Sequence, residues 1–176
     1  MILVKTIKPG RFKGDPMNRI LRNQLRKVGN TIIREDYGAI TKNWEEENKP
    51  KIKLHTHLTA RTPSPSIEIE VTGRVWNYVE EGTKPHAIFA GIYTGKSKKK
   101  SLAFPSMFSP KTTPGVIGSK AGKRGGTTVF TPFVWHPGTE PRHFHKAIVK
   151  KRRPWFKRQM EDAMREAVRA SGHGPS

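Results

Sequence analysis

The histidines are the side chains whose spacing gives the sharpest test for metal chemistry. His143 and His145 form one His-x-His pair, with His136 seven residues before the first, and His55 and His57 form another. Imidazole nitrogens bind zinc, copper and nickel, but positions i and i+2 share a face only on a strand. We expect a helix at His143, which separates that pair, and no third ligand accompanies His55 and His57. The sequence therefore predicts surface or hydrogen-bonding histidines and no metal site.

The carboxylates offer little for hydrolase or nuclease chemistry, which needs paired acids. The 14 acidic residues gather mainly at Glu45–Glu47, Glu68 and Glu70, Glu80–Glu81 and Glu161–Asp162. Glu68 and Glu70 share a predicted strand face, where two carboxylates can hold a cation, but we expect a solvated face paired with Lys or Arg. Gly122–Gly126 has the composition of a phosphate loop without its spacing. With no cysteine in the chain, thiol chemistry is also excluded. We expect no enzyme, no catalytic residue and no cofactor.

Charge is the strongest compositional signal. The 176 residues include 34 Lys and Arg but only 14 Asp and Glu, which gives a formal charge of +20. Such a field attracts nucleic acid, anionic membranes or acidic protein surfaces. No apolar run is long enough for a membrane span, and the apolar start is too short for a signal peptide. We expect a soluble protein, cytoplasmic when made, with no membrane partner.

The basic residues gather in two places. Residues 89–126 contain no acid and are rich in Gly, Ser, Thr and Pro, which predicts a long excursion with interface candidates. These candidates are Lys96, Lys98, Lys99, Lys100, Lys111, Lys120, Lys123 and Arg124. The second run is Lys150, Lys151, Arg152 and Arg153, followed by Trp155 and Phe156. Cations beside aromatic rings suit phosphates and bases, so this run is a candidate DNA contact, although the rings also suit helix packing.

The first elements follow from hydrophobic periodicity. Residues 1–8 alternate and predict a strand that ends at Pro9-Gly10. Asp15-Pro16 then starts an amphipathic helix, which we expect to end at Tyr37-Gly38, where glycine suits a C-terminal cap. Alternation over 51–58 and 67–72 predicts two further strands, joined through residues 62–65.

The C-terminal half predicts one more strand and a long helix. Residues 128–135 form the strand, Thr139 caps the helix, and Pro154 interrupts it before Ser171-Gly172 ends it. The fold class is α+β, with an antiparallel sheet packed by an N-terminal and a C-terminal amphipathic helix and a long basic loop. We expect a single domain over residues 1–171, which includes the excursion at 89–126, and a short tail at 172–176.

Two short segments of the chain echo one another. Gly82-Thr83-Lys84-Pro85-His86 and Gly138-Thr139-Glu140-Pro141-Arg142 each read Gly-Thr-charged-Pro, and His136-Pro137 precedes the second. In such a motif glycine permits a positive φ, threonine offers a cap oxygen and proline fixes the next φ. The pattern predicts two turns of the same design: the motif-turn residues are Gly82, Thr83, Pro85, His86, His136, Pro137, Gly138 and Thr139.

With these motifs the chain resembles the neck and tail-completion proteins of long-tailed bacteriophages. Residues 76–86 resemble their Val-Glu-x-Gly-Thr-x-Pro-His signature, and residues 102–104, 134–139 and 142–144 follow in the family's order. The resemblance covers residues 15–170. The basic segment is longer than the family pattern leads one to expect.

The resemblance implies a structural virion protein of the head–tail joining, tail-completion or tail-terminator type. Such a subunit forms a ring, typically a hexamer, between the head connector or adaptor ring and the tail tube or tail terminator protein, and DNA passes through its lumen. It implies no catalytic residue. The alternative left open by the charge is a free-standing basic nucleic-acid-binding protein, although no helix-turn-helix, RNA-recognition or zinc-finger pattern occurs.

Overall fold

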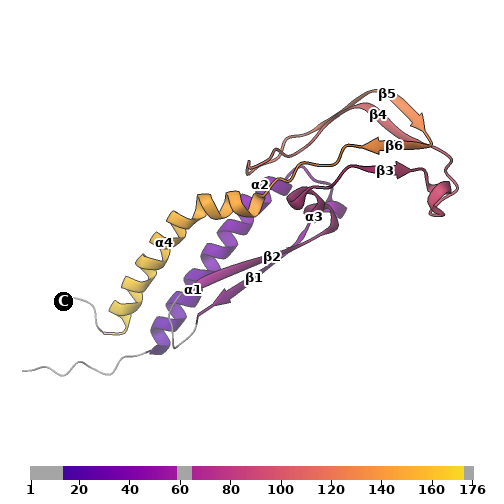
Figure 1. Ribbon diagram of the computed structural model, residues 1–176. Helices are drawn as coiled ribbons and strands as arrows, with labels where there is room; N and C mark the ends of the chain where they lie inside the picture. The colour runs from indigo at the N-terminus through magenta and orange to yellow at the C-terminus, as the bar shows by residue number, and fades with distance from the viewer. Residues whose placement is uncertain (1–13, 59–64, 173–176) are drawn as a thin grey trace, which may run out of the picture. The chain divides into compact units, whose positions relative to one another are not determined.

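The structure is a computed structural model that describes residues 14–58 and 65–172 (Figure 1). The strand predicted at 1–8, most of the connection at 62–65 and the tail from 173 lie outside these residues. Contacts divide the chain into two compact units. One comprises the described parts of Met1–Thr31, Leu54–Glu70 and Arg152–Ser176, and the other comprises Ile32–Lys53 and Val71–Lys151.

The elements confirm the α+β class, with a helix near each end. The helices are α1 (Gly14–Ile32), α2 (Gly38–Thr41), α3 (Arg74–Glu81) and α4 (Phe144–Ala170), with short turns η1 (Ile33–Tyr37), η2 (Glu46–Asn48) and η3 (Gly91–Thr94). The strands are β1 (Lys51–His57), β2 (Ser66–Thr72), β3 (His86–Phe89), β4 (Leu102–Ser109), β5 (Lys123–Thr131) and β6 (Phe133–His136). They form three two-stranded sheets, β1–β2, β3–β6 and β4–β5.

The first unit has a small helix–helix core. Leu21 of α1 packs with Ala163 and Ala167 of α4, and all three are almost fully buried. The Gln24 amide donates to the Gln159 side-chain oxygen at 2.8 Å. These positions recur at helical spacing, so each helix turns an apolar stripe inward, as the periodicity predicts.

On the solvent face of β1 and β2, Glu68 and Glu70 each lie beside a histidine of the neighbouring strand. His55 Nε2 lies 3.3 Å from Glu70 Oε2, and His57 Nε2 lies 3.3 Å from Glu68 Oε2. The two histidines share a face, as predicted. Among the described residues, no three ligating side chains come together in a geometry that could hold a metal ion.

Trp76 of α3 lies at the centre of the second unit's core and is 1% exposed. Its ring centroid lies 5.4 Å from Phe144, 5.6 Å from Tyr37 and 6.1 Å from Trp44. Asp36 is fully buried beside these rings, and its Oδ1 accepts from Lys151 Nζ at 2.8 Å. Burying an aromatic side chain of this size dominates the stability of a small core.

The N-terminal helical segment extends past its predicted end. Gly38 has helical dihedrals (φ −60°) and donates its N–H to the Ile33 carbonyl, so the chain stays helical through η1 and α2 to Thr41. The prediction of a glycine cap was wrong. Tyr37 and Ile40 are buried here, and the packing of these side chains outweighs the low helix propensity of glycine.

The C-terminal helix also differs from the prediction. α4 begins at Phe144 and not at Thr139, and Pro154 lies inside a continuous helix. Proline removes one hydrogen bond, to the carbonyl of Lys150, but Pro154 lies on the exposed side, where water can satisfy that carbonyl.

The segments between α3 and α4 supply two further corrections. The predicted strand at 128–135 is two strands, because Pro132 separates β5 from β6. The basic segment at 89–126 is not a bare loop, since it contains β4 and the start of β5. Of this hairpin, the predicted strand at 128–135 covers only the end of β5.

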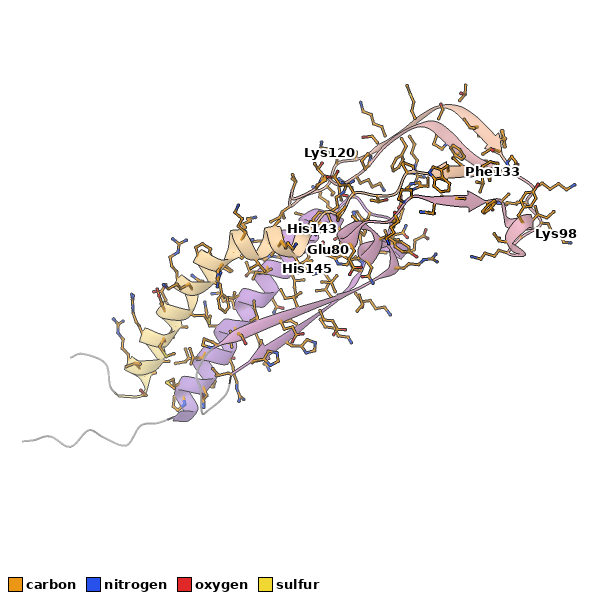
Figure 2. The ribbon with its side chains drawn as sticks, in the orientation of Figure 1. Glu80, Lys98, Lys120, Phe133, His143 and His145 are labelled. Atoms are coloured by element: carbon orange, nitrogen blue, oxygen red, sulfur yellow. The ribbon has the colours of Figure 1, made fainter. Side chains whose placement is uncertain are left out.

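The start of α4 is capped from α3. The Glu80 carboxylate accepts from the Phe144 N–H at 2.7 Å and from the His145 N–H at 3.2 Å, and Figure 2 shows Glu80 beside His143 and His145. The His145 ring packs edge-on to Trp76, and its Nδ1 lies 2.9 Å from the Tyr37 hydroxyl. Burial raises the pKa of Tyr37, and the nearby Glu80 and Asp36 charges raise it further. The hydroxyl therefore stays protonated and can donate to His145.

Replacing Glu80 with Gln should lower the free energy of unfolding by about 1–2 kcal/mol. The substitution removes a charged acceptor from free N–H groups at a helix N-terminus. Urea unfolding followed by circular dichroism measures the loss. Glu81→Gln is the matched control, because Glu81 is exposed, and it should change stability by less than about 0.5 kcal/mol. Equal effects of the two substitutions would contradict the capping role.

Candidate interaction surface

The two echoing motifs meet each other in the fold. Thr83 donates its N–H to the Thr139 carbonyl at 2.9 Å, and Thr139 donates its N–H to the Thr83 carbonyl at 3.1 Å. The Thr83 hydroxyl oxygen also lies 2.9 Å from the Thr139 nitrogen. We call this reciprocal contact the Gly-Thr clasp, formed by residues 82–85 and 138–141. Thr139 is therefore a clasp residue and does not cap α4.

The glycines of the Gly-Thr clasp are required by space as well as by conformation. Gly82 has φ +76°, and a Cβ there would meet the Thr139 carbonyl oxygen and lie 2.9 Å from the Pro141 nitrogen. Gly138 has φ +92°, and a Cβ there would meet the Thr83 carbonyl oxygen and lie 3.1 Å from the Pro85 nitrogen. Each glycine thus makes room for the backbone of the other motif.

The histidines of the motifs form the residue pair of the β3–β6 ribbon that lies nearest the clasp. His86 pairs with His136 in the antiparallel register, and their ring centroids lie 5.2 Å apart. His86 Nδ1 lies 2.8 Å from the Lys84 carbonyl, and the Gly138 N–H donates to His136 Nδ1 at 3.0 Å. Each imidazole ring therefore makes a hydrogen bond to the backbone of its own turn. Pro85 and Pro137 are exposed beside them.

The β3–β6 ribbon exposes aromatic side chains. Ala87 pairs with Trp135 and Phe89 with Phe133, so these four residues share one face. Phe89, Phe133 and Trp135 are 50%, 54% and 64% exposed. A two-stranded ribbon is marginal by itself in water, and contiguous exposed aromatics mark an interaction site.

The β4–β5 ribbon is exposed in the same way. Met107, Phe108 and Phe130 are each about two-thirds exposed or more. The register shifts between Pro105 and Met107, a bulge of the kind that bends a strand. The sequence did not predict that either ribbon would be exposed, because aromatic residues on a strand usually indicate a buried core. The one local indication was on β6, where Phe133 and Trp135 are two residues apart and so lie on the same face.

The predicted interface cations border these ribbons at different places. Lys96, Lys98, Lys99 and Lys100 lie between η3 and β4, and Lys123 and Arg124 begin β5. Lys120 lies in the connection between β4 and β5 (Figure 2). Lys111 is held by Glu45, with Nζ 2.8 Å from Oε1. No Asp or Glu occurs between Glu81 and Glu140, so the ribbons and their borders carry only positive charge.

The second basic run does not form one patch. Four consecutive helical residues point about 100° apart, so only Lys150 and Arg153 share a face. Lys151 pairs with the buried Asp36, and the Arg152 guanidinium lies 5.1 Å from the centroid of the Trp155 ring. Two of the four predicted DNA contacts therefore have partners within the chain.

No family model, curated protein or solved structure matches the chain. Within residues 14–58 and 65–172, no helix combines the length and apolarity needed to cross a membrane.

Substituting Ala for Gly82 or Gly138 should each lower the free energy of unfolding by more than about 2 kcal/mol, because both a positive φ and a backbone clash are imposed. Gly95→Ala imposes a positive φ (+69°) without a close neighbour, and Gly125→Ala imposes neither. We expect Gly95→Ala to cost about 1 kcal/mol and Gly125→Ala still less. Urea midpoints rank the four variants, and a clasp variant as stable as Gly95→Ala would contradict the clasp.

The Glu45 carboxyl should titrate at about pH 2, because hydrogen bonds from Lys111 and Asn48 lower its pKa from 4.5 to about 2. Since the folded pKa lies below the unfolded value, ionised Glu45 stabilises the fold above about pH 4.5, and this contribution is lost as the pH falls through 2. Carbon-detected NMR titration measures it. Lys111→Gln should return the pKa of Glu45 toward its ordinary value, and an unchanged titration in that variant would contradict the pairing.

Proposed function

We propose that the chain is a structural subunit of a tailed-phage neck, which forms a homo-oligomeric ring joining the head connector to the tail. The observation that carries the assembly role is the pair of exposed aromatic ribbons, β3–β6 and β4–β5. The neck assignment rests on the motif resemblance, whose two Gly-Thr segments form the clasp beside the first ribbon. The ring would act in the virion without catalysis.

The exposed ribbons suit contacts within such an assembly. Each ribbon offers apolar side chains whose burial contributes about 25 cal/mol per Å². Among the residues that the structure describes, each of these sheets has two strands, so its outer edges can accept a further strand. The bordering cations would complement acidic surfaces on the connector or tail rings, which gives register and fast docking.

A nucleic-acid-binding role is the second candidate. The observation in its favour is a stripe along α4, in which Lys146, Lys150, Arg153 and Lys157 recur at helical spacing and are all exposed. Lys157 also pairs with Glu161 at 3.8 Å. Such a stripe can follow a phosphate backbone, and in a ring it would serve the DNA in the lumen.

The assembly role predicts that surface substitutions abolish association without unfolding the subunit. Phe133→Ser with Trp135→Ser should prevent ring formation, alone or with connector and tail proteins, and leave the near-ultraviolet circular dichroism native. The control is Val149→Ser, since Val149 is 61% exposed on α4 outside the ribbons. Sedimentation velocity over a concentration series, with nucleic acid removed, gives the masses.

The same sedimentation assay also tests the role of the lysines. Gln at Lys98, Lys99 and Lys100 should impair assembly and particle yield, whereas Gln at the exposed Arg19, Arg22 and Arg26 of α1 should not. Normal assembly of both the aromatic and the lysine variants would overturn the proposal. A wild-type monomer that gains mass only when DNA is added, with affinity falling linearly against salt on logarithmic axes, would favour the second candidate.

A further inference from the structure

A cavity of about 320 Å³ lies in the second unit beside the Gly-Thr clasp. Its volume is at the lower end of the range for small-ligand sites. Trp44, Val75, Val79 and Phe108 give it apolar walls, and His136 and Thr139 of β6 and the clasp also line it. The cavity can therefore hold an apolar group the size of an aromatic ring.

The polar lining carries an excess of positive charge. Lys111, Arg124 and Arg142 line the cavity together with one carboxylate, Glu45. Glu45 accepts from Lys111 at 2.8 Å and from the Asn48 amide at 3.2 Å. The charges of Lys111 and Glu45 cancel. The guanidinium groups of Arg124 and Arg142 therefore have no acidic residue in the lining to balance them.

Arg142 is the second, independent sign of a ligand. Its side chain is 8% exposed, and its Nε has no hydrogen-bond partner among the described residues. The ion pair that it makes is long, 3.8 Å from Nη1 to Glu140 Oε2, and Glu140 is largely exposed. A buried guanidinium that is poorly paired is costly, and a buried donor without an acceptor marks the place of a missing partner.

We propose that this cavity binds an organic carboxylate with an apolar body. The planar guanidinium fork matches a carboxylate, and the aromatic and aliphatic walls match the body attached to it. A phosphate dianion fits less well, because it has no apolar body to pack against Trp44, Val79 and Phe108. The assignment depends only on the cavity and stands whether or not the chain forms a ring.

The probe is 3-phenylpropionate, which joins a phenyl ring to one carboxylate. The chain has four tryptophans, so ¹⁵N-labelled protein gives four indole N–H signals, and Trp44→Phe identifies that of Trp44. We expect a saturable shift of the Trp44 signal, while Trp155, which does not line the cavity, stays unshifted. The neutral 3-phenylpropionamide should bind at least about tenfold more weakly, because it loses the charge-assisted hydrogen bonds.

Variants and a second probe complete the test. Arg142→Gln should weaken binding about tenfold or more, with circular dichroism as the check on folding. The exposed Arg124→Gln should weaken it as well, and Lys98→Gln, outside the cavity, should not. A capped phenylalanyl-glutamate peptide compares the two sources of such a carboxylate. Tighter binding of the peptide identifies a protein segment, and tighter binding of phenylpropionate identifies a free acid.

Two results would overturn the proposal. One is the lack of a saturable Trp44 shift with both carboxylates at millimolar concentration. The other is equal binding of the acid and the amide by the wild-type protein, which needs no variant and so is independent of any folding defect. Neither result bears on ring formation, which the sedimentation experiment measures separately.

Discussion

The reciprocal backbone contact between Thr83 and Thr139 is the constraint on which the second unit depends. It lies in the same antiparallel register as the pairing of His86 with His136, so the clasp and the β3–β6 ribbon are one continuous arrangement. On its other side, the Arg142 N–H donates to the Val79 carbonyl at 3.0 Å. That contact brings the chain back to α3, where Glu80 caps α4 and Phe144 packs on Trp76.

Local patterns predicted the elements whose buried side chains recur with a clear helical or strand period. The amphipathic α1 and the alternating β1 and β2 follow from periodicity, since burial on one face fixes both the period and the element. The predictions failed where contacts distant in sequence decide the outcome. Gly38 stays helical because Tyr37 and Ile40 are buried, and Thr139 bonds to Thr83 instead of to α4.

The candidate site was predictable only in part, for the same reason. The echo of the two Gly-Thr motifs was visible in the sequence, but one sequence does not show which turn faces which. The cations at 96–100 were identified from composition alone. The exposed faces of Phe133 and Trp135, and the buried Arg142 without an acceptor, depend on which layers surround them, and a single sequence does not record those layers.

The clasp also links the ribbons to the cavity. His136 belongs to β6, Thr139 to the clasp and Arg142 to the approach to α4, and all three line the same space. A ligand that binds the folded clasp and not the unfolded chain stabilises the clasp by mass action. Because such coupling is reciprocal, a contact that fixes the β3–β6 ribbon would in turn strengthen the binding of a ligand in the cavity. Ligand binding in the cavity would therefore order the β3–β6 ribbon, and a partner bound to the ribbon would order the cavity.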